Sequence, residues 1–237
     1  MFVLYYTIHG VFCERAFELL MSVAATTIVL LYCVIEYATH GFNDVEAERD
    51  LKMGRLIVVC VLGPVDIVLG LIIARKIFIS KKLIFRTVGG NAAFQNMCQV
   101  MFCFTAFLKF DFQLVVSLLV LVLNGGVAHV TLGQTLVLGI GVPVSFCWVI
   151  LGFVMIRYES YKLSTAFWVI GLFLPIYAVY LLERTERNPT SPYLYPTTMA
   201  AGCIGLLIRA VTGGLSYLVV RNFNKGLKEK VYGIVEE

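Results

Sequence analysis

The stretch FQLVVSLLVLVLNGGVAHVTLGQTLVLGIGVPVSFCWVILGFVMI, residues 112–156, runs for 45 residues without one Asp, Glu, Lys or Arg. A helix crosses a bilayer in about 20 residues, so this stretch is long enough to cross twice. Of the 237 residues, 59% are hydrophobic and 14% are charged, whereas a soluble domain carries about 25% charged residues. Lipid leaves only helices or closed barrels, and these apolar runs do not alternate. We therefore expect an all-α, polytopic helical membrane bundle forming one integral membrane domain, residues 1–237.

Apolar stretches outside and inside this region define the predicted spans. The clear ones are 16–38, 56–75, 131–156, 163–182 and 198–220. Residues 91–130 are ambiguous. They predict either one long helix, with an amphipathic first half lying on the membrane surface and a second half that crosses, or two short spans, 92–108 and 112–130.

The distribution of Lys and Arg favours six spans over seven. With six spans, the side that holds both termini carries thirteen of these residues and the other side five, while seven spans divide them eight to ten. Loops on the cytosolic side are enriched in Lys and Arg. Asn91, Gln95 and Gln99 also share one helical stripe, as an interfacial helix requires, although such a stripe could instead face a bundle interior. We expect six spans with cytosolic termini, with seven spans as the alternative.

Two charges lie deep inside predicted spans. Asp66 is about ten residues into the second span and Arg209 about eleven into the last, so both are near the middle of the bilayer. A charge at that depth is costly unless it is paired or hydrated. Their opposite signs predict a pair. That pair is either a structural salt bridge that fixes helix register or an ion or proton site at Asp66 gated by Arg209.

Four other charges stand near the predicted span ends. Glu18 lies one turn inside the first span, Glu36 lies near its far end, and Lys109 and Asp111 lie where the third helix enters the hydrocarbon. Side chains at such positions usually extend to the interface, so we expect these four to do so. A transport pathway would instead need Glu18, Asp66 and Asp111 to line one route.

Basic residues gather before the third helix and in the tail after the last span. On the cytosolic side they would meet anionic lipid or a cytosolic partner protein. The candidates are Arg75, Lys76, Lys81, Lys82, Arg86, Lys225, Lys228 and Lys230.

Motifs for catalysis, metal binding and nucleic-acid binding are missing from the sequence. No two of the three histidines lie at helical spacing, and the seven cysteines form no C-x-x-C pair. No nucleophile elbow, zinc-protease motif or usable phosphate loop occurs. No basic stripe with interleaved aromatic residues suits nucleic acid. We expect no metal, no cofactor and no enzymatic activity.

Three segments resemble parts of a known family. LIFRTVGGN (83–91), FLKFDF (107–112) and NFNKGLK (222–228) are similar to segments of a fungal family of uncharacterised Golgi-apparatus membrane proteins. This chain departs from the family by having Val88-Gly-Gly-Asn for Ile-Gly-Ala-Asp, by lacking a phenylalanine run and by having Asn224 for glycine. The resemblance implies an endomembrane location and a cytosolic basic segment before the third helix. It implies no activity.

Three functions follow as hypotheses. The leading one is a non-enzymatic membrane protein of the Golgi or a related endomembrane, acting in membrane organisation or trafficking. The plasma membrane is the alternative location. The second is a small transporter or channel using Asp66 and Arg209. The third is a seven-helix receptor, which needs seven spans and termini on opposite sides, and for which the Asp-Arg-Tyr and Asn-Pro-x-x-Tyr signatures are absent.

Overall fold

The computed structural model describes residues 2–40, 46–123, 132–187 and 195–232, and these residues form helices and turns without a strand. The all-α prediction is confirmed for this part of the chain. The helices are α1 (Phe2–Phe12), α2 (Ala16–His40), α3 (Glu46–Ser80), α4 (Lys82–Val88), α5 (Ala92–Leu123), α6 (Leu132–Tyr158), α7 (Tyr161–Arg187), α8 (Tyr195–Val220) and α9 (Leu227–Tyr232).

Several of these helices are long and apolar enough to cross a membrane. Within the described residues, four stretches meet that criterion: Ala16–Ala38, Lys52–Val88, Ala92–Ser117 and Gly202–Val220. Pro143–Tyr158, in α6, is a shorter apolar helix. The apolar helices indicate a membrane-embedded protein. The count of six spans stays a prediction.

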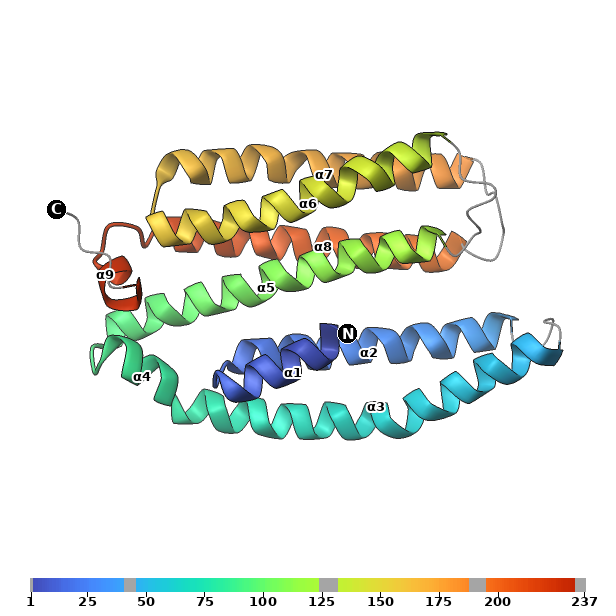
Figure 1. The fold of residues 1–237 in the computed structure, drawn as a ribbon, viewed down its shortest axis with the longest axis horizontal. Coiled ribbons are helices and arrows are strands. Elements are labelled where there is room, and N and C mark those ends of the chain that lie inside the picture. Colours follow the sequence, from blue (N-terminus) through green and yellow to red (C-terminus); the bar gives the residue numbers. More distant parts are fainter. Residues whose placement is uncertain (1, 41–45, 124–131, 188–194, 233–237) are drawn as a thin grey trace. The chain divides into compact units, whose positions relative to one another are not determined.

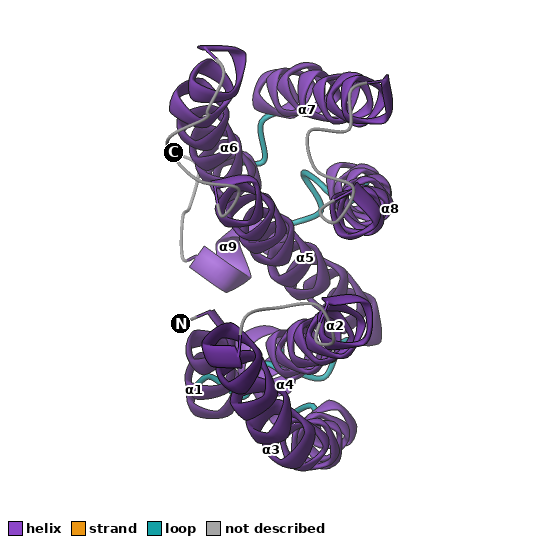
Figure 2. Ribbon diagram, turned by 90° about the vertical axis from the view of Figure 1, so that its right-hand side faces the viewer, coloured by secondary structure: helices purple, strands orange, loops and turns teal. Residues whose placement is uncertain are grey.

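The chain forms two compact units, Met1–Leu83 and Ile84–Glu237, where the sequence predicts a single domain. Figures 1 and 2 show α1 to α3 in the first unit and α5 to α9 in the second, with α4 spanning the boundary. Each unit contains candidate membrane spans. Both units therefore belong to the membrane part of the protein.

In the first unit, α1 folds back on α2, and α2 packs along α3. Glu14, with φ at +51°, makes the sharp turn between α1 and α2. Two glycines let α3 lie close to α2. A Cβ at Gly63 would stand 2.9 Å from Leu30 Cδ1. A Cβ at Gly70 would stand 2.7 Å from Val23 Cγ2, so a larger residue there would force the Val23 side chain to shift.

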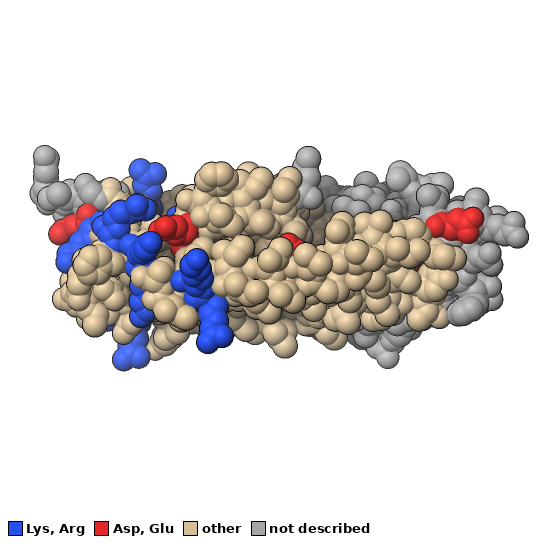
Figure 3. Space-filling model, turned by 90° about the horizontal axis from the view of Figure 1, so that it is seen from below, with Lys and Arg blue, Asp and Glu red and all other residues tan. Residues whose placement is uncertain are grey.

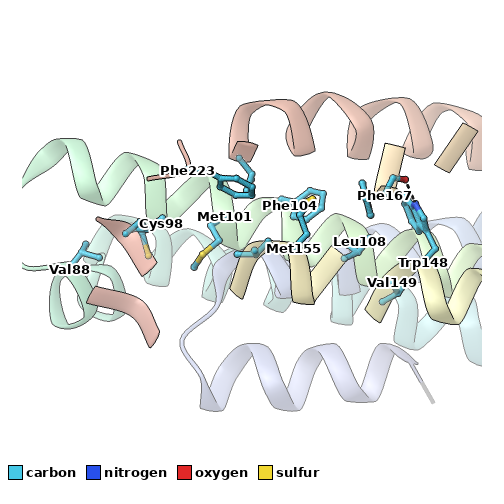
Figure 4. Packing of buried hydrophobic residues seen from close by; sticks show 13 residues of the cluster. Val88, Cys98, Met101, Phe104, Leu108, Trp148, Val149, Met155, Phe167 and Phe223 are labelled. Atoms are coloured by element: carbon cyan, nitrogen blue, oxygen red, sulfur yellow. Dashed lines mark hydrogen bonds between the residues drawn. The ribbon is translucent and has the colours of Figure 1, made fainter. Parts of the chain in front are cut away.

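In the second unit, α5 packs on both α6 and α8, and α7 packs on α6 and α8. The short α9 lies against α5 and α6. The core is a row of apolar side chains along α5, which Figure 4 shows from Cys98 to Trp148. Near one end of this row Trp148 stacks on Phe167 at 4.5 Å between ring centroids, and Phe104 meets Phe167 edge-on at 5.9 Å. Such close ring packing fixes the positions of α6 and α7 on α5.

For residues 92–123 the structure confirms the prediction of one long helix and corrects both the surface placement of its first half and the alternative of two short spans. The helix α5 runs without a break through 109–111, so the turn between two short spans is absent. Its first half is not a surface helix, because Cys98, Phe104 and Leu108 are each 0% exposed inside the second unit. The described residues of this segment, up to Leu123, therefore form one packed helix.

The polar stripe that suggested an interfacial helix has a local role. The Asn91 side-chain oxygen accepts a hydrogen bond from the Ala93 amide at 3.0 Å, as an N-cap residue does. Gln95 Nε2 donates to the Gly89 carbonyl at 2.9 Å, across the turn before the helix. Gln99 is half-buried. The first two of these residues thus start α5 and hold the preceding turn.

Candidate functional site

Arg209 of α8 forms an ion pair with Asp111 of α5 in the second unit. Arg209 Nη2 lies 2.6 Å from Asp111 Oδ2, and Nε donates to Oδ1 at 3.1 Å, so the guanidinium contacts both carboxylate oxygens. The two side chains are 11% and 3% exposed. The prediction that Arg209 pairs with Asp66 was therefore wrong. So was the expectation that Asp111 extends to the interface.

The ion pair is packed against aromatic and apolar side chains. The Arg209 guanidinium carbon lies 4.1 Å from the centroid of the Trp148 ring, a cation–π contact. Trp148 in turn donates its indole N–H to the Phe167 carbonyl at 2.9 Å. On α5, the fully buried Phe104 and Leu108 fill the core in the two turns before Asp111. This arrangement fits a pair that locks α5, α6 and α8 together.

Asp66 of α3 lies in the first unit and is half-buried. Its Oδ2 accepts a hydrogen bond from the Thr26 hydroxyl of α2 at 2.6 Å. Because Arg209 contacts Asp111 in the second unit, the structure provides no support for a gate made of Asp66 and Arg209.

Glu18 is buried at the turn between α1 and α2, at 1% exposure. Its carboxylate contacts His9 Nδ1 and lies 3.2 Å from Arg15 Nη1. Burial, with the nearby Glu18 charge, raises the pKa of the Tyr6 hydroxyl. The prediction that Glu18 extends to the interface was wrong, because α1 folds over it and supplies His9. No hydropathy pattern marks this contact, because it depends on the turn at Glu14.

Glu36 and Lys109 are the remaining two of the charges predicted at span ends. Glu36 of α2 contacts Arg55 of α3, which ties these helices together near their loop. Lys109 is half-buried on α5. Its predicted extension to the interface stays a prediction.

The basic residues around α4 are exposed. Figure 3 shows Lys and Arg side chains gathered at the end of α3 that leads into α4. The exposed residues there are Arg75, Lys76, Lys81, Lys82 and Arg86.

The tail after α8 folds back onto the second unit, which sequence reasoning missed. Glu159, in the turn between α6 and α7, accepts hydrogen bonds from the backbone amides of Asn224 at 2.8 Å and Lys228 at 3.0 Å. Lys225 Nζ donates to Asn222 Oδ1 at 3.0 Å, and Lys230 Nζ lies 3.9 Å from the centroid of the Phe94 ring. The tail lysines are thus held at a defined place. No hydropathy pattern identifies the carboxylate that binds these amides.

Among the residues that the structure describes, no group of three or more His, Cys, Asp or Glu side chains could hold a metal ion. Residues 1–75 and 88–217 match the family model of DUF7789, a domain of unknown function. No curated protein and no solved structure matches the chain. The match covers most of the chain and both compact units.

Proposed function

We infer the function of this chain, which belongs to the DUF7789 family, from its own charge distribution. The protein is a non-enzymatic, six-span integral membrane protein of the Golgi or a related endomembrane. It organises the membrane, or the traffic of its proteins, by binding anionic lipid head groups at the basic ends of its helices. The resemblance to fungal Golgi membrane proteins supports the location.

Six long helices support the six spans. α2, α3, α5, α6, α7 and α8 have between 25 and 35 residues each, and a crossing takes about 20. Lys109 and Arg209 lie inside helices, so we leave them out of the count. In the six-span topology, the side that holds both termini then carries twelve Lys and Arg residues and the opposite side carries five. The twelve are Arg15, Arg75, Lys76, Lys81, Lys82, Arg86, Arg157, Lys162, Arg221, Lys225, Lys228 and Lys230.

The asymmetry holds in each unit taken by itself. In the first unit the division is five to three, and in the second it is seven to two. The richer side is the cytosolic one by the positive-inside rule. Both units thus support the same orientation, with both termini in the cytosol.

The single observation that carries the lipid role is the exposure of the cations at the start of α4. Lys81, Lys82 and Arg86 are all exposed. They lie between α3 and α5, which are both predicted to enter the cytosolic leaflet at this end. That leaflet is negatively charged, and each Lys or Arg near it contributes about 1 kcal/mol of attraction. Three such residues therefore supply about 3 kcal/mol, enough to select anionic lipid over neutral lipid.

Transport by the buried charges is less well supported. Arg209 and Asp111 neutralise each other, and Arg209 is packed against Trp148. We expect such a buried pair to specify helix packing and not to move ions. The pairing therefore supports the proposed lipid-binding role over transport.

Neutralising the α4 cations will weaken the binding of anionic lipid. The full-length variant Lys81→Gln/Lys82→Gln/Arg86→Gln, reconstituted in phosphatidylcholine bilayers, should bind spin-labelled phosphatidylserine at least about tenfold more weakly than the wild type, because about 1 kcal/mol is lost per charge. The readout is the fraction of motionally restricted label in an electron paramagnetic resonance titration.

A control variant removes the same number of charges from the opposite side. Arg49→Gln/Lys52→Gln/Arg184→Gln should bind phosphatidylserine as the wild type does. Equal affinity in all three proteins would overturn the proposed lipid role. Equal weakening in both variants would show that net charge alone, and no particular surface, attracts the lipid.

A further inference from the structure

Asp66 lies near the centre of the uncharged part of α3. From Leu56 to Ala74 it is the only Asp, Glu, Lys or Arg. These 19 residues span about 28 Å of helix, close to the thickness of the hydrocarbon. Asp66 is the eleventh of them, so its carboxylate stands at mid-membrane depth.

The first unit supplies Asp66 with a hydroxyl and no cation. Thr26 donates the hydrogen bond to Oδ2. The nearest basic residues along α3 are Arg55, which contacts Glu36, and Arg75, about 13 Å along the helix. Within the described residues of the first unit, the carboxylate therefore has no positive partner.

The surrounding surface of α3 is open to another helix. Val65, Val68 and Leu69 are between 53% and 55% exposed, on the face of α3 that borders the half-buried Asp66. Pro64 has no amide N–H, so it cannot donate to the Cys60 carbonyl one turn before it. The middle of α3 thus presents a half-buried carboxylate at the edge of an exposed apolar surface.

Charge complementarity selects the occupant of this surface. A second copy docked through the same face by two-fold symmetry would bring two Asp66 carboxylates together, and like charges repel. Lipid chains offer no donor to a carboxylate. A helix with Lys or Arg at the same depth would neutralise the charge and donate hydrogen bonds, and buried ionisable residues in membranes usually pair in this way.

We propose that α3 docks, at Asp66, a transmembrane helix of another protein that carries Lys or Arg near the middle of its span. Thr26 positions the carboxylate, and the flanking valines and leucine provide the apolar contact. The site serves assembly with a membrane partner and is independent of the lipid-binding role.

The test uses the full-length protein in liposomes and two synthetic helices. Each is a polyleucine span of about 20 residues, with Lys at the centre of one and Gln at the centre of the other. Fluorescence energy transfer from a labelled protein to a labelled peptide reports association. We expect the wild type to bind the Lys peptide at least tenfold more tightly than the Gln peptide.

Variants at one position make the test specific. Asp66→Asn keeps an acceptor for Thr26 and should bind both peptides equally weakly, whereas Asp66→Glu should retain the preference for Lys. Circular dichroism and thermal unfolding check that each variant is folded. Equal binding of the two peptides by the wild type, or an undiminished Lys preference in folded Asp66→Asn, would overturn the proposal. So would self-association of the wild type that excludes the Lys peptide.

Discussion

Replacing Asp111 with leucine is expected to destabilise the second unit by about 3–5 kcal/mol, because Arg209 would remain buried without its carboxylate. The arginine is 11% exposed and stacked on Trp148, so it cannot reach water without unpacking α8. Burial within the membrane adds to the penalty, since a charge at the centre of a span is itself unfavourable by several kcal/mol. Arg209→Leu should have an effect of similar size.

The double variant Asp111→Leu/Arg209→Leu is the control. It removes both charges together, so it should recover most of the lost stability and reach within about 1–2 kcal/mol of the wild type or exceed it. Unfolding in mixed micelles by titration with dodecyl sulfate, followed by circular dichroism, gives the free energy of unfolding of all four proteins. Additive losses in the double variant would show that the two residues do not act as a pair.

Replacing Phe167 with alanine is expected to destabilise the second unit by about 3–5 kcal/mol, as Phe-to-Ala changes in packed cores do. The ring is 1% exposed, stacks on Trp148 and contacts Phe104. Its loss leaves a cavity that neither the lipid nor water fills, and the neighbouring rings lose their dispersion contacts. Loss of the stacking also loosens the indole that lies against Arg209.

Phe153→Ala on α6 serves as the matched control for this change. That ring is 37% exposed, so lipid can replace most of its contacts, and we expect a loss below about 1 kcal/mol. The same titration with dodecyl sulfate compares the two variants. If Phe153→Ala proved as destabilising as Phe167→Ala, the core described between α5, α6 and α7 would be wrong.

Helices and their positions could be predicted because hydropathy is a local property. The predicted span 198–220 lies within α8 (Tyr195–Val220), and 56–75 lies within α3. A run of apolar residues must be helical in lipid whatever its neighbours are. Length and charge boundaries therefore locate a helix in the sequence without knowledge of the fold.

The partners of buried charges could not be predicted from depth alone. Asp66 and Asp111 both lie in apolar helices, and both are candidates for Arg209. The choice depends on which helices are neighbours, and α8 packs on α5. Two residues of the polar stripe at the start of α5 were misread for a similar reason. Asn91 and Gln95 form hydrogen bonds with the adjacent backbone. In the sequence alone, their spacing is the same as that of polar residues on an interfacial helix.

The sequence also did not predict that the N-terminal helix and the C-terminal tail fold back onto their neighbours. The α1 helix covers Glu18, and the tail binds Glu159 through backbone amides. Neither contact has a hydropathy signature, because each depends on a turn geometry at a residue with positive φ, Glu14 in one case and Glu159 in the other. Such turns are rare for non-glycine residues and are not evident from composition.

The six-span topology is the central claim, and protease protection in sealed microsomes tests it most directly. The protein would carry one tag at each terminus and the substitution Pro189→Ala, which turns Asn188-Pro-Thr into a glycosylation acceptor. The account predicts that protease removes both tags from sealed vesicles while Asn188 becomes glycosylated, because its loop is on the lumenal side. One tag protected and the other removed would contradict six spans and favour a seven-span protein.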